Sequence, residues 1–323
     1  MASKLFFSTI FILFSLTAIA QTDTGEKTHL KIIKVKNNIH MLQGKGGNIG
    51  LSIGKDGIFM IDDQYADGIE QVQNEIKKIS DKPIRLLINT HFHGDHTGGN
   101  SAMADSGTII FSQENVRNRL LNIIQEEKKK VQANTLPMVT FSEDLTFNFN
   151  GEKIYVFHIH NAHTDGDAMV YFTNSNVLHT GDVFFNGKYP YIDTKNGGSI
   201  LGYIAAIEKA MMVINEDTKI IPGHGNIGTF KDLQKTTLML SNIYKKVSAL
   251  YITKKTEEDI LNMPELTKEY DEQGYGAGFI DRDAFLKMVY AEVAKSRKSI
   301  EVNEENNKKA REKLRDQMKE KKE

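Results

Sequence analysis

Short apolar runs separated by turn-forming residues predict β-strands in the first part of the chain. Runs at residues 38–43, 50–53 and 58–61 have the length and flanking turns of a strand meander. The glycine-rich segment at residues 44–48 predicts a flexible hairpin loop between the first two strands. Apolar residues then recur every three or four positions, at Ile69, Val72, Ile76 and Ile79. That spacing predicts an amphipathic helix with one face on a sheet, and residues 84–88 predict the next strand.

Strands and helices alternate through the middle of the chain. Further apolar runs predict strands at residues 108–111, 145–149, 153–159, 168–172, 177–179 and 219–221. Helical spacing predicts helices at residues 200–214 and around Val116, Leu120, Ile123 and Ile124. Sheets whose strands are this apolar must be covered by other elements. We therefore predict an α/β fold in four layers, a helix–sheet–sheet–helix sandwich.

The pattern changes after residue 232. Apolar residues at helical spacing predict two more helices, one carrying Leu233, Leu240, Ile243, Val247 and Leu250, the other Phe285, Met288, Val289 and Val293. From residue 303 the chain is almost wholly charged or polar, which predicts a tail that is disordered or partly helical. The expected organisation is a catalytic domain at residues 21–232, a helical extension at residues 233–302 and a charged tail at residues 303–323.

The first twenty residues have the pattern of a targeting segment. Lys4 is followed by an uncharged run, Leu5–Ala20, which is shorter than the roughly 20 apolar residues of a membrane span. The run ends in Ala18-Ile19-Ala20, the small-x-small pattern that a signal peptidase cuts. We interpret residues 1–20 as a secretory signal peptide, with an uncleaved anchor as the alternative. The expected protein is periplasmic or secreted and has no stable membrane anchor after cleavage.

Composition narrows the chemistry further. The chain has 41 Lys and Arg against 42 Asp and Glu, a net charge of −1 at pH 7. This balance offers no basic field for nucleic acid and no polybasic patch for a membrane. The absence of cysteine excludes disulfides and removes thiolate from the metal ligands. The expected partner is a small-molecule substrate, and a homodimer remains an open alternative.

Four metal-binding side chains lie within six residues, directly after the strand predicted at residues 84–88. They are His91, His93, Asp95 and His96, in the pattern H-x-H-x-D-H. Helical periodicity cannot bring these four side chains to one point, so we expect a tight loop at the end of a buried strand. Neutral imidazole suits Zn, Fe, Ni or Cu, and a carboxylate adds a hard oxygen ligand.

Three further candidates each follow a predicted strand: His163, Asp182 and His224. Strand ends of layered α/β sheets converge at one edge, so all seven side chains are expected to meet there. Seven ligands exceed the needs of one tetrahedral ion. We therefore expect two adjacent metal ions, with Asp182 as the bridging ligand between two groups, His91, His93 and His163 in one and Asp95, His96 and His224 in the other. Two such ions can share a hydroxide, which is hydrolase chemistry.

The order of these motifs resembles the metallo-β-lactamase superfamily over roughly residues 30–230. The motifs on which the resemblance rests are, in chain order, H-x-H-x-D-H, His163, Asp182 in H-T-G-D and His224 in P-G-H-G. The resemblance implies a four-layer αββα sandwich with a helical extension, a dinuclear site in the cleft between its halves, and metal-ligand roles for these seven residues. The stretch at residues 184–193 looks like that of exported β-lactamase-like hydrolases.

One departure from the lactamases is informative. The best-known lactamases of the Cys-containing subclass use a thiolate where this chain has Asp182, and they lack a ligand equivalent to His96. The pattern here is closer to that of hydroxyacylglutathione hydrolases, lactonases and nucleases. The resemblance therefore favours metallohydrolysis without favouring β-lactams as the physiological substrate.

Other polar residues near these motifs have candidate supporting roles. Asn48, Asn186 and Lys188 are candidates for substrate contacts, and residues 46–48 for a mobile flap over the cleft. Tyr189 and Tyr191 are candidates for an apolar wall. Five more residues are candidates for orienting ligands or for ordinary structural roles: Asp62, Asp63, His158, Asp167 and His179.

The expected function is that of an exported dinuclear zinc hydrolase that cleaves an amide or lactam, a lactone or an ester. Asp95 is the candidate catalytic residue, because a ligand through one oxygen can orient the attacking hydroxide with the other. A mononuclear-iron persulfide dioxygenase and a phosphodiesterase remain alternatives, and a purely binding module fits seven ligands least well. Two zinc ions per chain would favour hydrolysis, whereas one iron would favour the dioxygenase.

Overall fold

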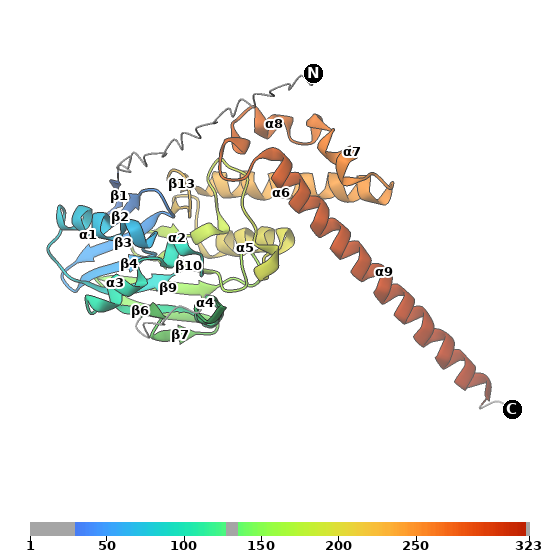
Figure 1. The fold of residues 1–323 in the computed structure, drawn as a ribbon, viewed down its shortest axis with the longest axis horizontal. Coiled ribbons are helices and arrows are strands. Elements are labelled where there is room, and N and C mark those ends of the chain that lie inside the picture. The colour runs from blue at the N-terminus through green and yellow to red at the C-terminus, as the bar shows by residue number, and fades with distance from the viewer. Residues whose placement is uncertain (1–29, 127–134, 321–323) are drawn as a thin grey trace, which may run out of the picture.

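Two β-sheets lie face to face with helices on their outer sides (Figure 1). The structure is a computed structural model that describes residues 30–126 and 135–320. The predicted signal peptide, residues 1–20, lies outside the described residues. The predicted fold class is confirmed, an α/β sandwich of two mixed sheets flanked by helices with a long C-terminal helix.

The first sheet contains seven strands in chain order. They are β1 (Lys31–Lys36), β2 (Ile39–Gln43), β3 (Ile49–Gly54), β4 (Gly57–Ile61), β5 (Ile84–Asn89), β6 (Ile109–Gln113) and β7 (Val139–Phe141). Strands β1 to β4 pair antiparallel, whereas β4 to β7 pair parallel. The carboxyl ends of β4 and β5 therefore lie side by side at one edge of this sheet.

The second sheet contains six strands in the order β13-β12-β11-β10-β9-β8. They are β8 (Asp144–Phe149), β9 (Glu152–His158), β10 (Ala168–Phe172), β11 (Val177–His179), β12 (Lys219–Ile221) and β13 (Gly228–Thr229). Strands β9 and β11 are both antiparallel to β10, and β11 is parallel to β12. Strands β9, β11 and β12 therefore all end at the same edge.

Helices cover the outer faces of both sheets. The helices of the described residues are α1 (Ile69–Lys77), α2 (Gly94–Thr97), α3 (Asn100–Asp105), α4 (Glu114–Glu126), α5 (Ile200–Val213), α6 (Phe230–Ile252), α7 (Glu257–Leu261), α8 (Lys268–Asp271) and α9 (Arg282–Glu320), of which α1, α3, α5 and α6 pack on the sheets. Short 3-10 turns connect them at η1 (Ala66–Gly68), η3 (Gly181–Val183), η4 (Thr194–Asn196), η5 (Pro264–Leu266) and η6 (Tyr275–Ala277). Within the described part of the chain, no helix combines the length and the hydrophobicity of a membrane span.

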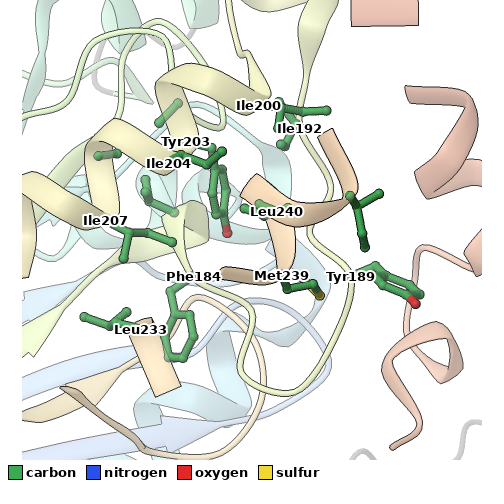
Figure 2. Close-up of a cluster of buried hydrophobic side chains, with 14 of the residues drawn as sticks. Phe184, Tyr189, Ile192, Ile200, Tyr203, Ile204, Ile207, Leu233, Met239 and Leu240 are labelled. Carbon is green, nitrogen blue, oxygen red and sulfur yellow. The ribbon is translucent and has the colours of Figure 1, made fainter. Parts of the chain in front are cut away.

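Successive side chains of a strand point to opposite faces of its sheet, so the apolar residues of one strand belong to two different cores. On β10, Ala168, Val170 and Phe172 pack between the two sheets, while Met169 and Tyr171 face the opposite side. The outer face of the first sheet packs on α1 and α3. The outer face of the second sheet packs on α5 and α6, and Figure 2 shows the side chains of this cluster around Tyr203.

The C-terminal helices pack against the outer layer of the second sheet. Helix α6 contacts both α5 and α9, and the C-terminal part of α9 projects away from the body (Figure 1). The charged tail predicted from residue 303 lies on this helix, which runs without a break to Glu320. Seven short elements were not predicted from the sequence: β1, α2, α3, β7, β13, α7 and α8. Helix α4 was predicted with an apolar side of four residues, of which Val116 alone is buried.

Candidate metal centre

The edge at which five strands end carries all seven predicted ligands. His91 and His93 follow β5, and Asp95 and His96 lie on the short helix α2. The other three are separated from these in the sequence but adjacent in space: His163 after β9, Asp182 in η3 after β11, and His224 after β12. The convergence of strand ends predicted from the sequence is therefore present in the structure.

A first group of ligands surrounds one oxygen of Asp182. It consists of His91, His93, His163 and Asp182, whose ligand atoms all lie within 4.8 Å of one another. The Nε2 atoms of His91 and His163 are 3.8 Å and 3.6 Å from Asp182 Oδ2. His93 turns its Nδ1 atom inward, 2.9 Å from His163 Nε2. Three imidazoles and one carboxylate oxygen thus point at a common centre.

A second group lies on the other oxygen of the same carboxylate. It consists of Asp95, His96 and His224, again within 4.8 Å of one another. His96 Nε2 and His224 Nε2 lie 3.1 Å and 3.4 Å from Asp182 Oδ1, and His224 Nε2 lies 3.2 Å from Asp95 Oδ2. Asp182 therefore occupies the position between the two groups that a bridging ligand requires. The two groups together form a candidate dinuclear metal site.

Unpartnered buried atoms show that this pocket fits cations. His91 Nε2, His96 Nε2 and Asp182 Oδ1 are all buried without a hydrogen-bond partner. A buried polar atom without a partner costs about 1–3 kcal/mol, and these three atoms face one another. Nitrogen and oxygen ligands in this combination suit zinc and other first-row transition metals.

The electrostatics of the pocket also favour cations. Burial lowers the pKa of His91 well below 6.5 and that of His163 to about 4, so both rings are neutral at pH 7. Burial would likewise lower the pKa of His224, but carboxylates led by Asp182 outweigh it and raise this pKa to about 9. Burial disfavours ionisation of Asp182, yet histidines led by His96 hold its pKa well below the usual range. The first group therefore keeps a carboxylate next to two neutral imidazoles, whereas in the second group the carboxylates favour the protonated imidazole in the absence of a metal.

A model of the metallo-β-lactamase superfamily matches residues 61–224, half of the chain and all seven of these ligands. The chain belongs to this superfamily. It is 25% identical over 170 residues to the hydroxyacylglutathione hydrolase GloC of Haemophilus influenzae, covering 50% of this chain and 78% of that protein. It is 23% identical over 212 residues to a linear primary-alkylsulfatase of Pseudomonas sp., covering 53% of this chain but only 40% of that protein. Among solved structures, the sec-alkyl sulfatase PisA1 superposes with a TM-score of 0.65 at 14% identity, over 81% of this chain and 50% of that one.

The outward nitrogens of the ligand histidines fix the orientation of each ring in this superfamily site. His96 Nδ1 donates to Asp62 Oδ2 at 2.7 Å, and His93 Nε2 donates to Asp193 Oδ2 at 3.1 Å. His163 Nδ1 donates to the carbonyl of Tyr191 at 2.9 Å. Such partners select the tautomer whose inward nitrogen is free to bind a metal.

Asp62 is the most heavily used of these supports. It is fully buried directly after β4, and its backbone adopts a left-handed φ of 60°. Besides His96, it accepts hydrogen bonds from the amide and hydroxyl of Thr90 at 2.7 Å and 2.8 Å. The expectation that Asp62 or Asp63 supports a ligand histidine is confirmed for Asp62. Asp63 instead accepts from the amide of Gly99.

Two other candidate supports organise the backbone of the ligand loops. Asp167 accepts from the amides of His163 and Thr164. His179 Nε2 donates to the carbonyl of Asn48 at 3.0 Å, which ties the second sheet to the first. His158 and the exposed His160 lie outside both ligand groups.

Two glycines approach the ligands too closely to carry a side chain. A Cβ atom on Gly223 would lie 2.0 Å from Asp182 Oδ1, and one on Gly47 would lie 2.1 Å from His96 Cε1. Gly94, by contrast, has open space at the corresponding position. The close packing around Asp182 and His96 therefore depends on missing side chains as well as on present ones.

The three predicted substrate contacts lie beside the ligand loops, with their polar groups already bonded. Asn48 Nδ2 donates to the carbonyls of Pro222 and Gly225 at 2.9 Å each. Asn186 Nδ2 donates to the carbonyl of Asn226, and Lys188 Nζ to that of Gly274 at 3.1 Å. These side chains tie loops together, and a role for them in substrate binding stays a prediction.

The glycine-rich loop predicted as a flap is attached on both sides of the cleft. The amide of Gly47 donates to the carbonyl of Asp95, and that of Asn48 to the carbonyl of Gly223 at 2.7 Å. Gln64 adds two hydrogen bonds to the same loop, to Gly46 and Gly47. Motion of this loop would break all of these contacts, so it forms part of the fixed wall of the site.

Proposed function

We propose that the protein is a dinuclear zinc hydrolase that cleaves an ester, lactone, amide or lactam. The observation that carries the proposal is the shared carboxylate of Asp182, with one oxygen facing each histidine group. A pair of divalent ions at such a site supplies a nucleophile at neutral pH, by lowering the pKa of water, and polarises a carbonyl oxygen.

The protein residues then have separate tasks. Asp95 is partly exposed in the cleft and places one carboxylate oxygen beside His224, which leaves the other to orient the attacking water. Three ligand imidazoles are held in a fixed orientation by hydrogen bonds to Asp62, Asp193 and the carbonyl of Tyr191. The buried rings of the first group exclude bulk water, which strengthens electrostatic interactions inside the pocket.

Relatives of known name support hydrolysis at an acyl or ester-like centre. The superfamily relatives include a hydroxyacylglutathione hydrolase and an alkylsulfatase. The ligand set without cysteine also matches the His-plus-bridging-Asp pattern better than the thiolate pattern. We also propose that the protein is exported to the periplasm or the medium, and the uncharged run Leu5–Ala20 supports this. The balanced charge of the chain supports a small-molecule substrate.

A metal titration beside a substrate panel tests the proposal. The protein is stripped with a chelator and reloaded with zinc, iron or manganese, and metal content is measured by elemental analysis. Hydrolysis of nitrocefin, a lactone set, a thioester set and p-nitrophenyl esters is then followed. We expect two zinc ions per chain and zinc-dependent turnover of a carbonyl substrate. Binding of one iron with oxygen consumption would identify a dioxygenase instead, and turnover of phosphodiesters alone would identify a phosphodiesterase.

A further inference from the structure

An open groove of about 790 Å³ runs between α9 and the loop that follows the metal ligands. On α9 it extends from Ala284 to Ile300, about 24 Å along the helix axis. Apolar residues make up much of its lining: Tyr191, Ile192, Leu201, Ile280, Met288 and Ile300. Leu201 and Ile300 are about half exposed, so the groove presents an apolar surface to solvent.

The groove shares residues with the supports of the metal centre. Tyr191 lines it, and the Tyr191 ring lies 5.9 Å from that of His93 and 5.7 Å from that of His163. Asp193 also lines it and binds His93. One end of the groove is therefore formed by residues in direct contact with the first ligand group.

Phe279 stands at this same end. Its side chain is 86% exposed, the highest value among the large apolar residues described, and its ring meets Tyr191 edge-on at 5.9 Å. Phe279 therefore adds apolar surface next to a groove residue rather than to the core.

The segment that carries Phe279 is fixed to the loop after Asp182. The ring of Tyr189 stacks on Phe285 at 4.5 Å and its hydroxyl donates to Asp271 at 2.8 Å. Figure 2 shows Tyr189 at the side of the cluster that adjoins the C-terminal segment. The Tyr189 amide also donates to the carbonyl of Tyr275. Phe279 is therefore held in place beside the metal centre by contacts on both sides of it in the sequence.

The charges along the groove disfavour cations. Asp193 is committed to His93 and Asn196, and Glu292 accepts from the amides of Ile200 and Leu201 at the start of α5. Among the described residues, the lining charges without such partners are Lys195 and Lys295, both positive. The groove therefore suits an apolar chain that is neutral or anionic.

We propose that this groove binds a long acyl chain of the substrate, with Tyr191 at the end of the groove nearest the metal centre and Phe279 beside Tyr191. The proposal rests on the hydrolase function proposed above and assigns it a substrate class, long-chain acyl esters or lactones. The helical extension, which lies outside the matched family region, then selects the substrate while the sandwich holds the metals.

A chain-length series tests this assignment on the full-length, metal-loaded protein. The p-nitrophenyl esters of acetate, butyrate, octanoate and decanoate are compared in the wild type, Ala284→Trp and Phe279→Ala. Met212→Ala serves as the matched control, because Met212 is 81% exposed on α5 but lies outside the groove. Binding of the fluorescent fatty acid cis-parinaric acid gives a second readout that does not require turnover.

We expect kcat/KM in the wild type to rise about two- to fourfold for each added methylene that is buried. Ala284→Trp fills the groove and should lower the decanoate-to-acetate ratio at least tenfold and weaken binding of the fatty acid. Phe279→Ala should lower that ratio mainly through KM, and Met212→Ala should match the wild type.

Three results would overturn the assignment. The first is a wild-type kcat/KM that does not change with chain length, and the second is an Ala284→Trp profile equal to that of the wild type. The third is a wild-type dimer in sedimentation velocity that Ala284→Trp dissociates, because that result would show that a second copy of the chain occupies the groove. Fatty-acid binding that Ala284→Trp weakens, without metal-dependent hydrolysis of any ester, lactone, amide or lactam, would instead keep the groove and refute the hydrolase function.

Discussion

Substitution of Asp62 by asparagine should empty the second metal position while leaving the fold intact. The carboxylate accepts two hydrogen bonds on Oδ2, from His96 Nδ1 at 2.7 Å and Thr90 Oγ1 at 2.8 Å. An amide nitrogen placed there donates instead of accepting. His96 must then accept on Nδ1 and carry its proton on Nε2, the atom that faces Asp182. The proton occupies the position that the metal needs.

The size of the effect follows from these contacts. Each hydrogen bond to a buried charge contributes about 1.5–3 kcal/mol, and rotation of the Thr90 hydroxyl recovers one of the two. We expect the free energy of unfolding of the metal-free protein to fall by about 2–3 kcal/mol, a decrease in Tm of roughly 3–5 °C. Loss of such a ligand partner typically weakens metal binding by about 10–100-fold. Asparagine tolerates the left-handed backbone at this position, so strain adds little.

Competition with a chromophoric zinc chelator measures both binding steps, and elemental analysis after dialysis gives the stoichiometry. Asp62→Asn should retain one zinc and lose the second. Asp63→Asn is the matched control, since Asp63 is equally buried one residue later but bonds Gly99 rather than a histidine. The reasoning is refuted if Asp62→Asn holds two zinc ions with the affinity of the wild type.

Three further outcomes test other parts of the structure. Gly223→Ala should lose both metals, because its methyl group would overlap Asp182. Gly94→Ala has room for the methyl group and should keep both metals, and elemental analysis of the two variants tests the difference. Glu292→Gln removes the charge that caps α5 and should lower stability by about 1 kcal/mol in thermal unfolding. Burial lowers the pKa of His158 below 6.5, so the unfolded chain binds this proton more tightly and stability should fall as the pH drops below 6.5. Because His91 and His163 share this direction of shift, His158→Gln should reduce that fall rather than abolish it in urea unfolding of the metal-free protein between pH 7.5 and 5.5.

The metal ligands were predictable because only a few residue types, here histidine and aspartate, can bind a metal through their side chains. Histidine and aspartate are uncommon directly after apolar strands, and seven of them in such positions together indicate a metal site. Their supports were only partly predictable. The partner of His163 is the main-chain carbonyl of Tyr191, which any residue could supply. Asp193 lies 100 residues from the histidine it orients, and no spacing pattern connects the two.

Polar residues near the site were harder to interpret. Asn48, Asn186 and Lys188 are candidates for substrate contacts, and each also donates to a backbone carbonyl. A polar side chain beside a cleft can tie two loops together as readily as it can bind a ligand, and its position in the sequence does not show which of the two it does.

The fold could be predicted from short continuous apolar runs wherever strands are buried on both faces. Strand β1 was missed because lysines interrupt it at an edge of the sheet, where no alternation to a buried face is required. The end of the chain was predicted as a tail from its charge, yet α9 continues to Glu320. Glutamate and lysine are good helix formers, and Glu305 and Lys309 pair at 2.7 Å one turn apart.

The two oxygens of one aspartate link the filling of two cation positions. An ion bound to Oδ2 of Asp182 would order the same carboxylate whose Oδ1 faces the second group. It would also repel a second ion, and the single negative charge between the two would reduce that repulsion. Occupancy at either position would thus depend on occupancy at the other. A substitution that disturbs the ligands of one position would therefore also change the affinity of the other.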